Sequence, residues 1–365
     1  MTQKKEFLKN PYFKSGFPQD RGVDPTSTNV EAVKKLLDLC PKAAKTPLIK
    51  SEILSKKMGV KNIWFKDERE RMGLGSFKAL GATYVIASHA AEKVSPNSSL
   101  DEWKSSLSDR TYISASAGNH GLSLAAGARL FGAKAVIYLS KNVPSNFAER
   151  IKDYGADVII HGNDYEESLE GAKQAADLNK WFLLSDVTWD GYDHGLKVME
   201  GYLVMAAEAF DECIDKPTHI FLQAGVGGFP ASVATLARKY YGNEIQIIIV
   251  EPTKAPVLLE SIRAGKAVTV TGGVSNMGRL DCKNPSTKAL SSLAITCTHF
   301  MTIADEDASN AVKELKANNL NTSPSGAAGY AAITDAKNFI ESQIDHNSNI
   351  SVSYTHLRAH ETLVH

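Results

Sequence analysis

The sequence predicts an α/β protein built on two open, twisted, mostly parallel sheets with helices on both faces. Apolar strand-like runs alternate with helical patterns from residue 111 to residue 252. Several of these runs, such as Ile247–Val250, are continuously apolar, which is typical of parallel strands covered on both faces. Glycine-rich turns follow strands near residues 118 and 225. Ligands bind at such carboxyl ends of strands in open α/β sheets, so we expect a cleft there.

Length and charge limit the classes of protein that are possible. A chain of 365 residues is too long for one small core, so two domains are expected. Lys+Arg and Asp+Glu are equal at 41 each, which argues against nucleic acid or an anionic membrane as the main partner. No apolar run approaches membrane-spanning length, and the N-terminus lacks the apolar segment of a signal peptide. The chain is therefore expected to be a cytoplasmic, enzyme-like protein.

Cysteine and histidine spacing predicts neither a disulfide framework nor a metal site. The four cysteines lie far apart and form no CxxC pair, and the ten histidines lack ligand spacing. The cysteines are Cys40, Cys213, Cys282 and Cys297.

The expected elements begin with an amphipathic helix over residues 29–40, for which Asn29 is the candidate N-cap. A short strand follows at 62–68, and a helix starts near Gly75. Beyond residue 110 the expected strands are 111–116, 134–140, 156–162, 181–186, 219–225 and 245–252. The expected helices between them are 118–132, 144–155, 164–179, 195–213 and 228–242.

The segment "SASAGNHGLSLA", Ser114–Ala125, joins a strand to a helix within three residues. The backbone amides of Gly118, Asn119 and His120 would point out of the helix N-terminus, where anions bind. A small carboxylate is the ligand that such a turn would hold. A simple capping turn explains the same residues, so this motif alone leaves both interpretations open.

The segment "FLQAGVGGFPAS", Phe221–Ser232, places Gly225, Gly227 and Gly228 between a strand and a helix. Glycines let backbone N–H groups approach a phosphate closely. The spacing is neither GxGxxG nor a P-loop, so one phosphate of a cofactor fits better than a dinucleotide. Close helix–sheet packing is the alternative explanation.

Lys78 lies among Phe77, Ala79 and Leu80, directly after a glycine-rich turn. Partial burial favours the neutral amine, a nucleophile that forms a Schiff base with an aldehyde. An ordinary surface lysine is the alternative. Taken together, the amine, the phosphate loop and the carboxylate turn match pyridoxal 5'-phosphate and an amino-acid substrate.

The motifs "GSFKALG", "SAGNHG" and "GVGG", in this order, resemble the tryptophan-synthase-β-like (fold type II) family of pyridoxal-phosphate enzymes, which includes the serine and threonine dehydratases. Within that family, "KDERERMGLGSFKALGA", "DVTWDGY", "FLQAGVGG" and "IIIVEP" are similar to the 2,3-diaminopropionate ammonia-lyases. The resemblance extends from about Asn10 to about Ile350. It implies pyridoxal-phosphate-dependent α,β-elimination that yields pyruvate and ammonia.

The resemblance also implies roles for individual residues. Lys78 corresponds to the Schiff-base lysine, and Asp186 matches an aspartate that serves as a base. The implied cofactor-binding residues, besides Lys78, are Asn119, Gly225, Val226, Gly227 and Gly228. The implied substrate-binding residues are Ser116, Ala117, Gly118, Asn119 and His120.

One departure from the ammonia-lyase pattern concerns stereochemistry. Those enzymes carry an aspartate, tied to the D-isomer, where this chain has Ala117, as the dehydratases do. The expected substrate is therefore L-2,3-diaminopropionate. A serine, threonine or hydroxyaspartate dehydratase, a racemase, or an impaired protein that only binds the cofactor or an amino acid are the alternatives.

The expected division places residues 1–78 and 191–350 in a large cofactor-binding domain and 79–190 in a small substrate-binding domain. Residues 351–365 start like a strand and then become a His-rich tail without core periodicity. We treat this tail as either a genuine extension or foreign sequence, and leave it out of the predicted fold. No partner for the pyridine nitrogen is assigned for this reason. A homodimer is implied by the resemblance.

Overall fold

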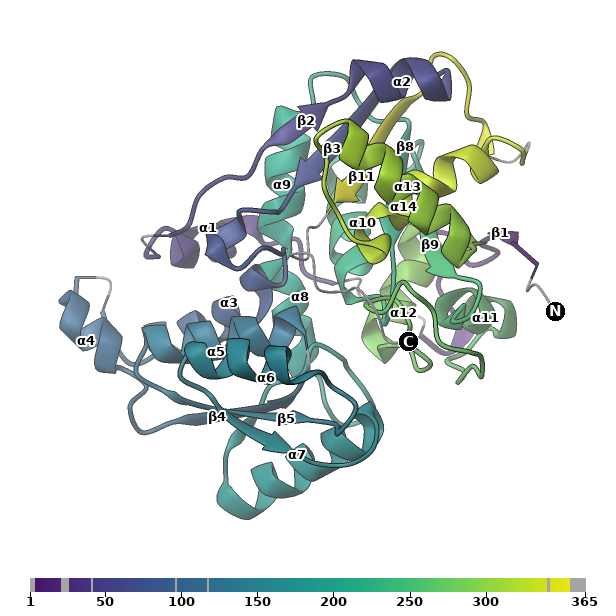
Figure 1. The fold of residues 1–365 in the computed structure, drawn as a ribbon. Coiled ribbons are helices and arrows are strands. Elements are labelled where there is room, and N and C mark those ends of the chain that lie inside the picture. The colour runs from purple at the N-terminus through teal and green to yellow at the C-terminus, as the bar shows by residue number, and fades with distance from the viewer. Residues whose placement is uncertain are drawn as a thin grey trace.

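The computed structural model contains two separate sheets, each with helices on both faces (Figure 1). This confirms the predicted fold class. The structure describes residues 4–20, 26–40, 42–95, 97–116, 118–339 and 342–354. Ala117 and residues 355–365 therefore lie outside the described residues.

The larger sheet has seven strands and is parallel except at its two edges. In spatial order the strands are β1 (Phe7–Lys9), β10 (His299–Ile303), β9 (Gln246–Pro252), β8 (His219–Gln223), β11 (Asn349–Tyr354), β3 (Asn62–Asp67) and β2 (Leu48–Lys50). The edge strands β1 and β2 run antiparallel to β10 and β3. The inner strands are buried along almost their whole length, as their continuous apolar runs predict.

The smaller sheet is entirely parallel and lies in the lower lobe of Figure 1. Its strands, in spatial order, are β6 (Asp157–Ile160), β5 (Lys134–Leu139), β4 (Thr111–Ala115) and β7 (Phe182–Leu183). One face packs against α7 through a small apolar cluster that includes Ile113, Val136 and Ala172. The other face packs against α5. Every strand ends toward the same edge, so the loops that follow β4 and β7 come together there.

The helices nearest the smaller sheet are α3 (Ala79–Ala91), α4 (Leu100–Ser105), α5 (Asn119–Leu130), α6 (Ser145–Asp153) and α7 (Tyr165–Asn179). The helices around the larger sheet are α1 (Val30–Leu37), α2 (Glu52–Met58), α8 (His194–Gly201), α9 (Leu203–Glu212), α10 (Gly228–Tyr241), α11 (Val257–Ala264), α12 (Thr287–Thr296), α13 (Asp305–Ala317) and α14 (Pro324–Ala336). Short 3-10 turns occupy Pro18–Asp20 and Arg71–Gly73. None of the described helices is long and apolar enough to cross a membrane.

The structure corrects the expected extent of the tail. Residues 351–354 belong to β11, which lies in the middle of the larger sheet between β8 and β3. Ile350 and Val352 are fully buried in this strand. The strand-like start of residues 351–365 is therefore part of the fold, although these residues were left out of the predicted fold together with the His-rich tail.

Two expected helix features have clear outcomes. The Asn29 side chain accepts a hydrogen bond from the amide of Ala32 at 3.2 Å, which confirms Asn29 as the N-cap of α1. The expected helix over 195–213 is two helices, α8 and α9, which meet at Tyr202. The division into domains at residues 78/79 and 190/191 stays a prediction.

Candidate active site

Lys78 stands at the junction between the two sheets, directly before α3. The chain leaves β3 and passes through a tight turn in which Met72, Gly73 and Gly75 all have positive φ, between 51° and 78°. Glycine adopts this conformation without steric cost, whereas Met72 does not. After the turn, the Lys78 amide donates a hydrogen bond to Ser76 Oγ at 3.2 Å. The turn therefore presents the Lys78 side chain at a fixed point in front of α3.

Lys78 forms an ion pair with Asp186, which follows β7 of the smaller sheet. The two side chains are 31% and 15% exposed. The sequence predicted a partly buried lysine, and the structure agrees. It adds a partner that the sequence did not predict, because the Asp186 carboxylate contacts Nζ of Lys78.

The ionisation of Asp186 depends on this contact. Burial alone would raise the pKa of Asp186, but the charge and hydrogen bond of Lys78, together with contributions from His120 and a backbone hydrogen bond, outweigh burial and hold the pKa well below its usual range. Asp186 is therefore an anion at neutral pH for as long as Lys78 carries its positive charge.

The turn before α5 is closed by Ser116. Its hydroxyl accepts hydrogen bonds from the amides of Gly118 at 3.3 Å and Gly121 at 3.2 Å. The sequence predicted that the Gly118 amide would face a ligand, and in the structure Ser116 occupies it instead. Within the described part of the chain, the Asn119 and His120 amides and the Asn119 side chain have no hydrogen-bond partner. These remain available at the N-terminus of a twelve-residue helix.

Gly118 gives Arg279 room to approach the turn and is not needed for its backbone angle. Its φ is −122°, which any residue adopts. A Cβ at Gly118 would lie 2.8 Å from Arg279 Nη1. Arg279 comes from the larger domain's loop before α12, and its guanidinium also lies over the ring of Phe147. The sequence gave no signal for this arginine, because it stands far from any motif.

His120 is buried directly behind the turn. Its Nε2 lies 2.9 Å from the carbonyl of Leu184, so this nitrogen donates and Nδ1 is left as an acceptor. Nδ1 is buried without a hydrogen-bond partner among the described residues. Burial lowers the pKa of His120 despite the nearby Asp186 charge, so the ring is neutral at neutral pH.

The glycine loop, residues 225–228, follows β8 and starts α10. Gly227 has φ = 102°, which disfavours any side chain. A Cβ at Gly225 would lie 2.9 Å from Cys282 Sγ and 3.0 Å from the Arg279 carbonyl. In the part of the chain that the structure describes, no residue accepts a hydrogen bond from the amides of Gly225, Val226 or Gly227. Three unpaired amides at the N-terminus of a long helix fit a phosphate.

Several side chains that sequence reasoning missed fix the loop that carries Asp186. The Tyr192 hydroxyl accepts from the Ser185 amide at 2.8 Å and donates to the Leu183 carbonyl at 3.0 Å. Ser286 Oγ accepts from the Thr188 amide at 2.9 Å. These bonds hold the backbone on both sides of Asp186, in a segment that otherwise has little regular structure.

Ser286 also joins this loop to the glycine loop. Its amide donates to the Val226 carbonyl at 2.9 Å, while its hydroxyl contacts both the amide and the hydroxyl of Thr188. The Asp186 loop and the glycine loop are therefore connected through one buried residue. The sequence did not predict this role for Ser286, because a single serine before a helix is usually an N-cap.

A model of the pyridoxal-phosphate-dependent enzymes matches residues 39–350. The chain belongs to this family. Diaminopropionate ammonia-lyase from Salmonella typhimurium is 35% identical over 263 residues, which cover 67% of this chain and 65% of that enzyme. The enzyme of the same name from Escherichia coli K12 is 32% identical over 280 residues, covering 74% of this chain and 70% of that one. The aligned region thus spans about two thirds of these relatives.

Solved structures agree with the family assignment. Escherichia coli diaminopropionate ammonia-lyase in complex with D-serine superposes with a TM-score of 0.86 at 26% identity, covering 97% of this chain and 94% of that one. Threonine deaminase from Solanum lycopersicum has the same fold, with a TM-score of 0.76 at 20% identity. The predicted resemblance and the predicted cofactor, pyridoxal phosphate, are confirmed by these comparisons.

The residues present in this family member fit the cofactor. Pyridoxal phosphate needs an amine, a phosphate site and a polar contact for its ring. Lys78 supplies the amine, and the unpaired amides of the glycine loop supply the phosphate site. The unpaired Asn119 side chain supplies the polar contact for the ring. The residues described by the structure contain no cluster of metal-binding side chains.

Proposed function

We propose that this chain catalyses the pyridoxal-phosphate-dependent elimination of ammonia from 2,3-diaminopropionate, with the L-isomer favoured. The observation that carries the proposal is the Lys78–Asp186 contact, which puts an amine and a carboxylate at one point between the two domains. An elimination that expels an amine needs a base for the Cα proton and an acid for the leaving group. The names of the relatives in Salmonella typhimurium and Escherichia coli support the choice of substrate.

In this proposal Lys78 holds the cofactor through its amine, Asn119 lies beside the ring, and residues 225–228 bind the phosphate. When bound, pyridoxal phosphate supplies an electron sink for the negative charge that develops at Cα. The unpaired amides of Asn119 and His120, with Ser116 and Gly118 shaping the turn, would bind the substrate carboxylate. Ala117, which stands between Ser116 and Gly118 in the sequence, is kept as a proposed substrate-binding residue.

Asp186 is proposed as the base that removes the Cα proton. Its low pKa makes it a weak base while the Lys78 ammonium is beside it. Once Lys78 is neutral, the charge that lowers this pKa is gone, and the buried carboxylate becomes more basic. Lys78, when it is protonated again, is placed to give a proton to the departing β-amine.

The overall reaction balances without any further reactant except water. The Cα–H and Cβ–N bonds break, a C=C bond forms, and the β-amine leaves as ammonia. The resulting enamine tautomerises to an imine, which water hydrolyses to pyruvate and a second ammonia. No oxidant or reductant is needed.

We further propose the domain division given by the sequence, a homodimeric assembly and a cytoplasmic location. The two sheets, built from strands within residues 7–67 with 219–354 and within 111–183, support the division. The family resemblance supports the dimer, and the enzyme-like sequence supports a location in the cytoplasm. Light scattering on the purified holoenzyme tests the dimer.

The substrate proposal is tested by adding L- and D-2,3-diaminopropionate, L-serine and L-threonine separately to the holoenzyme and following 2-oxo acid release. We expect turnover of L-diaminopropionate and much less of the D-isomer. Turnover of serine and threonine alone would assign the chain to the dehydratases. A protein that binds the cofactor but releases no 2-oxo acid would be a binding protein.

A further inference from the structure

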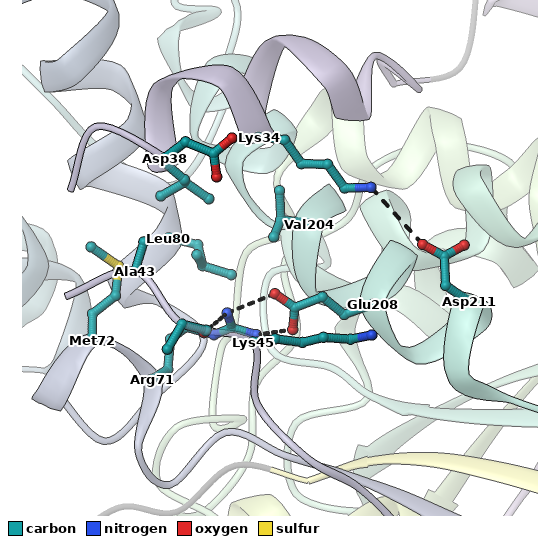
Figure 2. A pocket seen from close by; sticks show the side chains of 12 residues that line it. Lys34, Asp38, Ala43, Lys45, Arg71, Met72, Leu80, Val204, Glu208 and Asp211 are labelled. Carbon is teal, nitrogen blue, oxygen red and sulfur yellow. Dashed lines mark hydrogen bonds and ion pairs between the residues drawn. The ribbon is translucent and has the colours of Figure 1, made fainter. Parts of the chain in front are cut away.

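A cavity of about 250 Å³ lies between α1, α9, the start of α3 and the loop before β2, and neither Lys78 nor Asp186 lines it (Figure 2). Its polar lining residues are Lys34, Asp38, Lys45, Arg71, Glu208 and Asp211. Figure 2 shows the α1 side chains on one side of the cavity and Arg71 with Glu208 on the other. The family's cofactor chemistry does not use these residues, so their role is open.

Arg71 has no N–H group left for a ligand, and Glu208 is held by two buried cations. The Arg71 guanidinium is 2% exposed and donates to both oxygens of Glu208, both of Glu68, the Ala44 carbonyl and Thr46 Oγ1. Lys66 adds an ion pair to Glu208 at 2.8 Å. All five guanidinium N–H groups are therefore used. This buried network is a fixed floor for the cavity.

The α1 side of the cavity carries one positive and one negative side chain that can each accept or donate further hydrogen bonds. Lys34 Nζ is 3.7 Å from Glu31 and 3.9 Å from Asp211, which is too far for a hydrogen bond. Asp38, one helical turn further, has no ion pair or hydrogen bond through its carboxylate in the described chain. One ammonium and one carboxylate with free hydrogen-bonding positions thus stand four residues apart on one helix face.

We propose that this cavity is a second ligand site, which binds a small amino acid in its zwitterionic form. Lys34 receives the carboxylate, Asp38 receives the ammonium, and the apolar surface of Leu37, Met72 and Val204 receives the side chain. A zwitterion gives Lys34, which has only two long ion pairs, a carboxylate at hydrogen-bond distance and gives Asp38 a counter-charge, whereas a plain anion or cation satisfies one group and repels the other. The volume is below the roughly 300 Å³ at which drug-sized sites begin, which excludes a nucleotide.

A ligand bound in this cavity would affect the active site through the segment from Arg71 to Leu80, which contains Lys78. Arg71 and Met72 open the positive-φ turn that leads to Lys78, and Leu80 follows Lys78 by two residues. A ligand that packs on Met72 and Leu80 touches the segment on both sides of the lysine. We therefore expect bound amino acid to change kcat at saturating substrate, where competition at the active site is absent.

The test uses the holoenzyme and the twenty standard L-amino acids, added one at a time at millimolar concentration. Binding is read as a rise in Tm, since a ligand of the folded state stabilises it. The variant K34A/D38A removes both recognition groups, and the exposed neighbour on the same helix gives the control K35A. Both should fold, because the positions are at the surface and the loss of Asp38 removes a negative charge from a helix C-terminus.

We expect at least one amino acid to raise Tm in the wild type and in K35A. The affinity of K34A/D38A for that amino acid should be lower by about tenfold or more. The same amino acid should alter kcat in a saturable way in the wild type and K35A, but not in K34A/D38A at the same concentration. The proposal is overturned if no amino acid raises Tm, or if the rise is the same in K34A/D38A. The Tm readout does not require turnover, so its result is separate from that of the proposed lyase activity.

Discussion

Lys78 and Asp186 form an ion pair although they stand 108 residues apart and belong to different sheets. Lys78 follows the last turn after β3 of the larger sheet, and Asp186 follows β7 of the smaller one. The contact therefore depends on how the two sheets face each other. It also sets the charge of Asp186, since the lysine ammonium keeps the carboxylate ionised.

Replacing Lys78 by Ala should abolish covalent cofactor binding and activity. Lys78 is the amine that forms the ion pair with Asp186, and it is the proposed Schiff-base lysine. The visible absorbance that remains after addition of pyridoxal phosphate and dialysis checks this expectation. K93A, which removes a surface lysine paired with Asp109, is the control and should keep the colour. Survival of the colour in K78A would show that a different lysine holds the cofactor.

Asp186→Asn should lower kcat by about 10²-fold or more, which is the usual contribution of a positioned general base. Cofactor absorbance should remain, because Lys78 is intact. Asp190, exposed in the following turn, gives the matched control D190N, which should be near wild type. Steady-state kinetics with L-diaminopropionate provides the measurement. Equal rates in D186N and wild type would assign the base to another residue.

Tyr192→Phe should lower kcat about tenfold or more with little change in KM. The hydroxyl makes two hydrogen bonds to the backbone beside Asp186, and small misplacements of catalytic groups are costly. Tyr138 on β5 makes no hydrogen bond through its hydroxyl to a described residue, so Y138F is the control. If Y192F matched Y138F in kcat, Tyr192 would have only a packing role.

Gly225→Ala should weaken cofactor binding by about tenfold, because the new methyl group would lie 2.9 Å from Cys282 Sγ and push the glycine loop outward. Gly273 is exposed, has open space at its Cβ position and lacks a positive φ. G273A is therefore the control. Titration of each apoenzyme with pyridoxal phosphate measures the difference. An unchanged affinity in G225A would remove this loop from the phosphate site.

Glu208→Gln should destabilise the fold by about 3–5 kcal/mol, because it leaves Arg71 and Lys66 buried without their shared counter-charge. Glu212→Gln, which breaks the more exposed pair with Lys45, should cost less than about 1 kcal/mol. Urea unfolding of both variants gives the comparison. Equal losses would contradict the burial argument.

Glu208 also makes a prediction about pH. Burial raises the pKa of Glu208, but Arg71 and Lys66 outweigh burial and lower it below the ordinary value. A carboxyl whose folded-state pKa is lowered adds stability above its unfolded pKa, and this stability is lost as pH falls through the folded pKa. The wild type should therefore lose more unfolding free energy than E208Q between neutral pH and acid pH. Parallel curves for the two proteins would contradict this.

Much of the fold could be predicted from the sequence because most of its strands are short apolar runs. The run Ile247–Val250 is apolar throughout and lies within the buried strand β9. β11 was not readable in full, because Ser351 and Ser353 interrupt its apolar pattern while its neighbours β8 and β3 bury it. The split of the helix at Tyr202 was also not predicted, because the only local mark is Gly201 and a single glycine does not by itself end a helix.

The candidate site shows a similar division. Lys78 and the glycine loop could be predicted from the glycines near them in the sequence. Glycine is needed where the backbone turns with positive φ or approaches another group. Tyr192, Ser286 and Arg279 carry no such mark. Their roles come from contacts across 7 to 98 residues of chain or between domains. Only the folded chain brings these groups together.

The central claim is that this enzyme breaks a Cβ–N bond. The most direct measurement is the ratio of ammonia to pyruvate that the holoenzyme releases from L-2,3-diaminopropionate. The account predicts two ammonia for each pyruvate, one from Cβ and one from hydrolysis of the enamine. Release of pyruvate from L-serine, with one ammonia for each, and no reaction with diaminopropionate would contradict it.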